Sequence, residues 1–309
     1  MTVKPLADAA APETAAARRE SLIGVGYGLA AFLFWGVAPI YFKLVAHVAA
    51  PEILAHRIAW SAVFLVLLVG LLRRWHGVVA ALTSWRLFLP LLLSAAILSA
   101  NWFTYIVAVN SGQVLQASLG YYINPLVNVL LGMIFLKERL RPAQIAAVAL
   151  AAIGVAVMVG AAGQIPWIAL FLGFSFGFYG LIRKLVPVDA ISGLSVEAVA
   201  LTPFALGYIF WLGNAGSFGA VGLATDLLLV AAGLVTLLPL LWFNASAKRL
   251  KLSTVGILQY VAPTGQFLLA VLLFGENFTP VHMVTFACIW AGLALYTADA
   301  LRGSKGRER

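Results

Sequence analysis

The chain has 309 residues, of which 63% are hydrophobic and 10% charged, with a net charge of +9. A soluble globule of this size could not bury so much apolar surface, so the composition excludes a soluble domain and indicates lipid as the solvent. Apolar runs of about 20 residues match membrane-spanning helices, and the roughly 10-residue alternation of a membrane barrel is missing. The one cysteine, Cys288, excludes an internal disulfide, and no metal cluster or cofactor is expected.

Ten membrane-spanning helices are predicted in chain order, which makes the expected fold an all-α integral membrane protein. An alanine-rich tail over residues 1–20, which lacks an apolar run and is expected to be disordered, precedes them, and a second tail covers 301–309. The first apolar run is too long for the core of a signal peptide and is expected to stay in the protein. The predicted spans are 22–42, 53–72, 87–109, 114–136, 143–161, 165–185, 194–212, 227–247, 254–275 and 279–299.

Basic residues predict the orientation of these spans. Eighteen of the 20 lysine and arginine residues lie in the tails and in alternate loops, and only Lys43 and Arg57 do not. Because cytoplasmic loops are enriched in these residues, both termini are expected in the cytoplasm and the protein in the plasma (inner) membrane. This topology accounts for the net charge, so no nucleic acid is expected as a partner, and the basic loops are expected to face anionic lipid.

Two segments of the chain repeat each other. YYINPLVNVLLGMIFLKE at 121–138 and QYVAPTGQFLLAVLLFGE at 259–276 share identical residues at a constant offset of 138, including Tyr122 with Tyr260 and Pro125 with Pro263. The predicted repeats are 21–162 and 163–300, each with five spans. Because five is odd, the second copy crosses the membrane in the opposite direction, a pattern typical of secondary transporters.

Pro125 and Pro263 lie toward the middle of their predicted spans, where proline bends a helix and frees the carbonyl four residues earlier. We interpret them as paired hinges beside a central cavity. The alternative, also common in membrane proteins, is that the bends serve helix packing only.

Arg57 is the most informative charge, because an ionised side chain inside a span is costly and usually faces a cavity or a partner. It lies close enough to the outer end for a lipid-facing anchor to be an equal alternative. Aromatic and amide side chains form further polar stripes along the helices, which suggest a cavity wall. The alternative is that the amides form hydrogen bonds between neighbouring helices. The candidate substrate-binding residues are Trp35, Arg57, Asn101, Tyr105, Tyr121, Asn124, Gln259 and Tyr260.

No carboxylate lies at the predicted midplane, so an obvious proton relay is missing. Glu52 and Glu197, near the starts of corresponding spans in the two halves, are the candidates for coupling to an ion. Glu197 could instead be a carboxylate favoured by the helix dipole. The sequence leaves the coupling open.

Four blocks resemble RarD-type permeases of the EamA family, within the drug/metabolite transporter superfamily. They are FWGVAPIYFK at 34–43, EILAHRIAWS at 52–61, NWFTYIVAVNSGQVLQASLGYYINPL at 101–126 and LQYVAPTGQFLLAVLLFGE at 258–276. The resemblance implies ten helices, two EamA repeats and a plasma-membrane location, but no particular substrate. The second repeat departs from the first at Ala262, where the first has Asn124.

The expected function is a secondary transporter, expected to export small amphipathic or amino-acid-like metabolites or drugs by alternating access. An enzyme is not expected, since the four histidines are scattered and neither HExxH nor GxSxG occurs. A membrane channel or a non-transporting scaffold remains the alternative. The expected partners are a small-molecule substrate and the bilayer, and the sequence leaves a homodimer open.

Overall fold

A computed structural model describes residues 15–137, 142–162, 165–247, 249–250 and 258–305. Within these ranges the regular structure is entirely helical. Nine of the described helices are long and apolar enough to cross a membrane, and Val261–Leu273 is a shorter apolar one. The predicted all-α membrane fold is therefore confirmed.

Eleven α-helices and two short irregular ones follow each other along the described chain. They are α1 (Ala15–Leu44), α2 (Ala50–Leu71), α3 (Trp75–Thr83), α4 (Trp85–Asn110), α5 (Val114–Leu136), α6 (Pro142–Ala162), α7 (Trp167–Leu185), α8 (Ala190–Leu212), the 3₁₀ turn η1 (Gly213–Ala215), α9 (Leu223–Ala247), α11 (Val261–Leu268), the π-helix η2 (Leu269–Leu273) and α12 (Pro280–Lys305).

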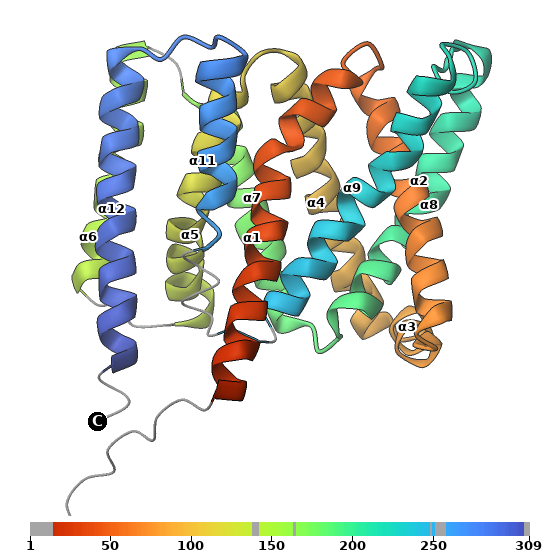
Figure 1. Cartoon of the computed structure of the whole chain (residues 1–309), viewed down its shortest axis with the longest axis horizontal. Helices are drawn as coiled ribbons and strands as arrows, with labels where there is room; N and C mark the ends of the chain where they lie inside the picture. The colour runs from red at the N-terminus through yellow and green to blue at the C-terminus, as the bar shows by residue number, and fades with distance from the viewer. Residues whose placement is uncertain (1–14, 138–141, 163–164, 248, 251–257, 306–309) are drawn as a thin grey trace, which may run out of the picture.

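The long helices run between two ends of the molecule (Figure 1). The start of α1 and the end of α12 lie at the lower end in this view, which we call the terminal end, together with the connection from α7 to α8. The opposite end, which we call the far end, holds the connections 45–49, 111–113, 213–222 and 274–279.

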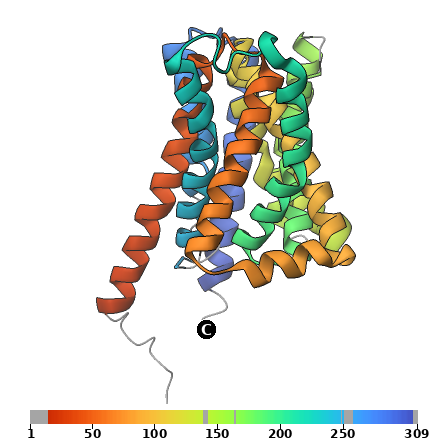
Figure 2. The ribbon, with the colours of Figure 1, turned by 90° about the vertical axis from the view of Figure 1, so that its right-hand side faces the viewer.

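The helix α3 lies across the terminal end (Figure 2) and was not predicted, since residues 73–86 were interpreted as a loop. Nine residues are too few to span a bilayer. Arg73 and Arg74 precede α3, and the ring of Trp75 at its start is exposed. Basic and tryptophan side chains of this kind are typical of a helix lying in the membrane interface.

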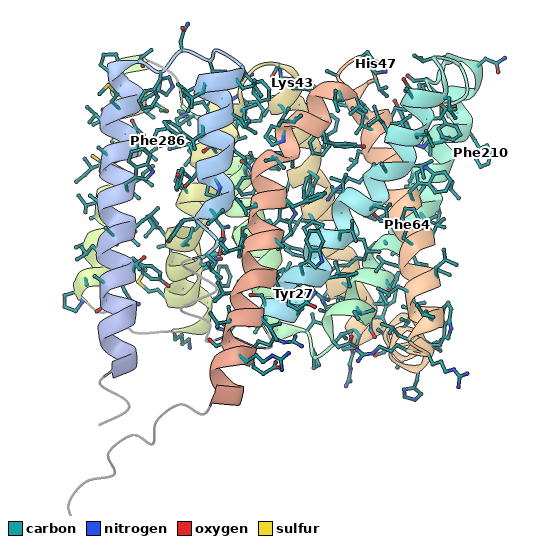
Figure 3. The ribbon with its side chains drawn as sticks, viewed as in Figure 1. Tyr27, Lys43, His47, Phe64, Phe210 and Phe286 are labelled. Carbon is teal, nitrogen blue, oxygen red and sulfur yellow. The ribbon has the colours of Figure 1, made fainter. Side chains whose placement is uncertain are left out.

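Glycines allow the helix backbones to approach closely. An added Cβ at Gly120 of α5 would lie 2.7 Å from the Ala169 carbonyl oxygen of α7, and Gly36 of α1 meets Gly265 of α11 in the same way. Such contacts are how membrane helices associate where the hydrophobic effect gives little help. Large apolar side chains on the outside, such as Phe210 at 79% exposure, face outward where lipid would surround them (Figure 3).

The predicted span 254–275 differs in detail from the structure. Its residues 254–257 lie outside the described residues, Gln259 and Tyr260 form a turn, and α11 begins only at Val261. Pro263 is therefore in the first turn of α11 and not in a helix middle, and at that position a missing N–H costs little. Pro125, in contrast, lies inside α5 as predicted.

Candidate functional site

A cavity of about 540 Å³ lies among α1, α2, α4, α5, α7, α8, α9 and α11. Its wall includes Arg183, Val188 and Ala190, around the connection from α7 to α8 at the terminal end. None of the described residues in the far-end connections lines it. The cavity therefore reaches the terminal end and is closed toward the far end.

Arg57 of α2 is only 6% exposed and lines this cavity. Its Nε donates to Thr236 Oγ1 of α9 at 2.6 Å, and the Thr236 hydroxyl donates in turn to the Ala232 carbonyl at 3.0 Å. Its guanidinium carbon lies 3.4 Å from the ring centroid of Trp102 of α4. No ion pair to Arg57 occurs among the described residues. The side chain is thus held inside the bundle by two neighbouring helices and is not drawn out to the lipid headgroups.

Aromatic rings form much of the wall around Arg57. Trp102 meets Tyr105 edge-on with 5.5 Å between ring centroids, and Tyr105 lies 5.8 Å from Tyr121. Trp35 and Phe243 extend the aromatic surface on the other side. Of the predicted substrate-binding residues, the cavity wall includes Trp35, Arg57, Tyr105, Tyr121 and Gln259.

Asn101 and Asn124 are not on the cavity wall. Asn101 is fully buried and donates to the Leu172 carbonyl at 3.0 Å and to Ser175 Oγ at 2.8 Å, both on α7. Asn124 donates to the Gly173 carbonyl of α7 at 3.1 Å. These amides hold α4 and α5 against α7, which is the role that the alternative interpretation gave them.

Tyr260 also lies away from the cavity. It borders a separate groove with Tyr122 and Trp290, between α5, α11 and α12. The Tyr122 hydroxyl shares a hydrogen bond of 2.6 Å with Thr264 Oγ1. The two repeated tyrosines thus meet each other, with 6.5 Å between their stacked rings.

Glu197 of α8 lines the cavity at 4% exposure. Its carboxylate accepts from Ser94 Oγ at 2.6 Å and from the Tyr179 hydroxyl at 3.5 Å, and Arg183 Nε lies 3.6 Å from it.

Sequence reasoning missed Arg183, Tyr179 and Thr236. It assigned Arg183 to a basic loop. The available signal was that Tyr179 and Arg183 are four residues apart and share one helix face.

Glu52 and Glu276 join elements at the far end. Glu52 accepts from the backbone N–H of Ser217 at 2.5 Å and of Phe218 at 3.3 Å, and from Ser217 Oγ at 3.0 Å. Glu276 accepts from the N–H groups of Val114 and Leu115 at 2.7 and 2.8 Å, which are unpaired donors at the start of α5. Burial raises the pKa of Glu276, although these two N–H donors and Lys43 act in the opposite direction.

Further contacts close the far end, where Lys43 and His47 lie (Figure 3). Lys43 Nζ lies 5.4 Å from the ring centroid of Phe274, and His47 Nε2 shares a hydrogen bond of 3.0 Å with Thr225 Oγ1. The Tyr41 hydroxyl donates to the Leu228 carbonyl at 2.8 Å. Together with the two glutamates, these contacts join residues from the first half of the chain to residues from the second.

The fold and the cavity define the class of protein: a polytopic helical membrane protein with a central cavity of ligand size that is closed at one end. Residues 22–160 match the EamA-like transporter family. Protein RarD of Salmonella typhi is 49% identical over 280 residues, which cover 90% of this chain and 95% of that protein. Protein RarD of Escherichia coli K12 is 47% identical with the same coverage.

An uncharacterized transporter of Vibrio cholerae serotype O1 is 48% identical over 289 residues, covering 93% of this chain and 95% of that protein. A solved crystal structure shares the fold with a TM-score of 0.57 at 23% sequence identity, covering 90% of this chain and 96% of the other. The chain belongs to the EamA family of drug/metabolite transporters, and within it to the RarD-type permeases. It is a membrane transporter, and the resemblance seen in the sequence is confirmed.

Proposed function

We propose that this chain is a secondary transporter that exports small amphipathic carboxylates, including amino-acid-like metabolites or drugs, by alternating access. The observation that carries the proposal is the guanidinium of Arg57, which lies on the wall of an aromatic cavity without a carboxylate partner among the described residues.

A buried cation without a partner is costly, since its desolvation is not compensated by an opposite charge. Thr236 and the face of Trp102 offset part of this cost, but neither carries a negative charge. A bound carboxylate would supply that charge and could accept two parallel N–H bonds from the guanidinium. This favours an anionic or zwitterionic substrate over a neutral one.

The rest of the cavity indicates the body of the substrate. A volume of about 540 Å³ lies in the range of sites that take small molecules. The rings of Trp35, Trp102, Tyr105, Tyr121 and Phe243 offer apolar faces on the wall of the same cavity, with Trp102 in contact with the cation. A compound with one carboxylate and a flat or branched apolar body fits this combination.

The proposed direction is export, which the closed far end supports. The far end is held by Glu52 and Glu276, whereas the cavity reaches the terminal end, which carries most of the lysine and arginine residues. By the positive-inside rule we assign the terminal end, and with it both termini, to the cytoplasm. The structure then corresponds to the cytoplasm-open state, in which an exporter loads its substrate.

The experiment that tests the proposal is substrate exchange in proteoliposomes with a panel of aromatic and branched carboxylates and their neutral amides. We expect uptake of labelled carboxylate to be stimulated by unlabelled carboxylate inside, with the amides much less effective. Equal exchange of acids and amides would contradict a carboxylate site. A steady ionic current without exchange would instead identify a channel.

A further inference from the structure

A second charged cluster lies in the same cavity, nearer the terminal end. Glu197 of α8 is contacted by Ser94 of α4 and by Tyr179 and Arg183 of α7. Arg57, on the neighbouring helix α2, lines the same cavity farther from the terminal end. The helix α3 also packs against α8, and the titratable residue that α3 carries is His76. At the start of α8, Asp189 pairs with Arg74 at 3.6 Å outside the cavity wall. Glu197 is thus the carboxylate that lines the cavity among the described residues.

The hydroxyl of Ser94 can serve Glu197 in two protonation states. It has two acceptors within reach, the Glu197 Oε1 at 2.6 Å and the Leu91 carbonyl oxygen at 2.8 Å. When Glu197 is ionised, the hydroxyl donates to the carboxylate. When Glu197 is protonated, the carboxyl O–H can donate to Ser94 Oγ while Ser94 donates to Leu91. The Ser94 hydroxyl and the Glu197 carboxyl thus stay hydrogen-bonded to each other in both states, which avoids the cost of an unpaired buried polar group.

Glu52 and Glu276 do not line the cavity, and their carboxylates contact backbone N–H groups at the far end. Of the two coupling candidates, the geometry therefore favours Glu197, which lies on the cavity wall, over Glu52.

Arg183 has donor capacity that the described protein does not use. Its Nε faces Glu197, but its Nη1 is buried without a hydrogen-bond partner among the described residues. The guanidinium lies directly on Gly193 of α8, where an added Cβ would overlap with it. A ligand in the cavity could offer an acceptor to Nη1 only after the guanidinium moves away from Gly193, and a weaker attraction to Glu197 would permit that movement.

We propose that Glu197 is a proton-binding site coupled to the anionic substrate, with Arg183 as a second anion contact released when Glu197 is protonated. The inference rests on the proposed anion transport. Arg57 and Arg183 with ionised Glu197 give the cavity wall one net positive charge, and neutralising the carboxylate raises this to two. Proton and anion therefore strengthen each other's binding, as linkage requires. Transport of one proton with one monoanion is electroneutral, so its direction is set by the combined concentration gradients of the proton and the anion.

The test uses the full-length protein in lipid nanodiscs and toluene-4-sulfonate, which stays a monoanion at every pH used. Its affinity is measured by calorimetry from about pH 8 to about pH 5, the range over which a perturbed carboxyl titrates. We expect binding to tighten roughly tenfold toward the acid side, as an added unit charge near an anion implies. In a weak buffer near the midpoint, binding should also take up protons.

Glu197→Gln should bind tightly at every pH and take up no protons. The matched control is Glu20→Gln, which removes a carboxylate that is paired with Arg249 outside the cavity and should keep the wild-type pH dependence. Ser94→Ala removes the reversible partner and should move the midpoint of the pH dependence. It also keeps the test decisive if Glu197→Gln does not fold.

Each outcome bears on one of the two proposals. The coupling would be overturned if sulfonate binding did not change with pH in the wild type. It would also be overturned if the pH dependence survived in Glu197→Gln or kept its midpoint in Ser94→Ala. The proposed anion transport would stand in each of these cases. No binding by the wild type at any pH would contradict the anion site itself, and with it the coupling.

Discussion

Arg57 and Trp102 meet inside the bundle, with the guanidinium carbon 3.4 Å from the ring centroid of the indole. Stacking on an aromatic face holds a guanidinium flat and leaves its N–H edges free to donate. Nε is already used by Thr236, so a cavity ligand would meet the Nη groups.

The first prediction concerns Arg57 itself. Arg57→Lys should insert and fold normally but weaken carboxylate binding by about 1 to 3 kcal/mol, because lysine offers no planar fork for bidentate bonds. Arg57→Gln should lose more, since the charge goes as well. The measurement is calorimetric binding in nanodiscs, with Arg86→Lys, an exposed residue outside the cavity, as the matched control. Wild-type affinity in Arg57→Lys would make Arg57 a structural residue.

The second prediction concerns closure of the far end by Glu276. Glu276→Ala leaves the N–H groups of Val114 and Leu115 without their acceptor, so the far end should open more often. Opening can be followed as labelling of Leu54→Cys, on the cavity wall, by an impermeant maleimide added outside cells, in a Cys288→Ser background. We expect labelling to be several-fold faster in Glu276→Ala. Unchanged labelling would show that Glu276 does not hold this end.

The third prediction is the pH dependence of the same labelling. Burial raises the pKa of Glu276 in the closed form, so the proton is bound more tightly there than in a form where the carboxyl meets water. By linkage, protonation of Glu276 therefore favours the closed form. This stabilisation is fully present below the ordinary glutamate pKa of about 4.3, and it is lost as the pH rises through the raised pKa of Glu276 in the closed form. Labelling, corrected for thiolate reactivity with a free thiol, should rise with pH across this window. Glu276→Gln, which mimics the protonated form, should remove that rise.

The fourth prediction concerns orientation. A reporter that is active only outside the cytoplasm should give signal when inserted in the far-end connection 213–222, and none when fused after Arg302. The reason is that these sites lie at opposite ends of the molecule (Figure 1). The reversed pattern would place the open end of the cavity outside the cell and contradict the cytoplasmic assignment of the terminal end.

The fifth prediction separates the two prolines. Pro263 lines the cavity, and its carbonyl accepts from Ser118 at 2.8 Å, whereas Pro125 lies within α5 and off the wall. Pro263→Ala should therefore reduce transport more than it reduces the amount of folded protein. Pro125→Ala should reduce transport less than Pro263→Ala does, because Pro125 does not line the cavity and can affect it only through the position of α5. If transport in both variants fell only as far as the amount of folded protein did, the prolines would have a packing role.

Much of the architecture followed from the sequence because a lipid-facing helix needs an uninterrupted apolar run, which is a local property. The candidate site was predicted less completely. Helical spacing placed Asn101 and Asn124 on polar stripes, but could not tell that α7 covers both. The partners of Glu52 and Glu276 lie more than 160 residues away, so no local pattern reveals them. The short helix α3 was missed because it has no long apolar run, and its buried Val78 and Ala81 pack against residues of α2, α4 and α8 that are distant in sequence or outside any local pattern. The boundaries of the two predicted repeats stay a prediction.

The most direct test of the account is counterflow in proteoliposomes made with wild type and with Arg57→Gln. Vesicles loaded with an unlabelled aromatic carboxylate should accumulate the labelled compound transiently above its external concentration in the wild type, because one site faces each side in turn. Arg57→Gln should show little accumulation at the same amount of folded protein. Wild-type vesicles that only equilibrate the label, or Arg57→Gln vesicles that accumulate it equally well, would contradict alternating access at an Arg57-centred anion site.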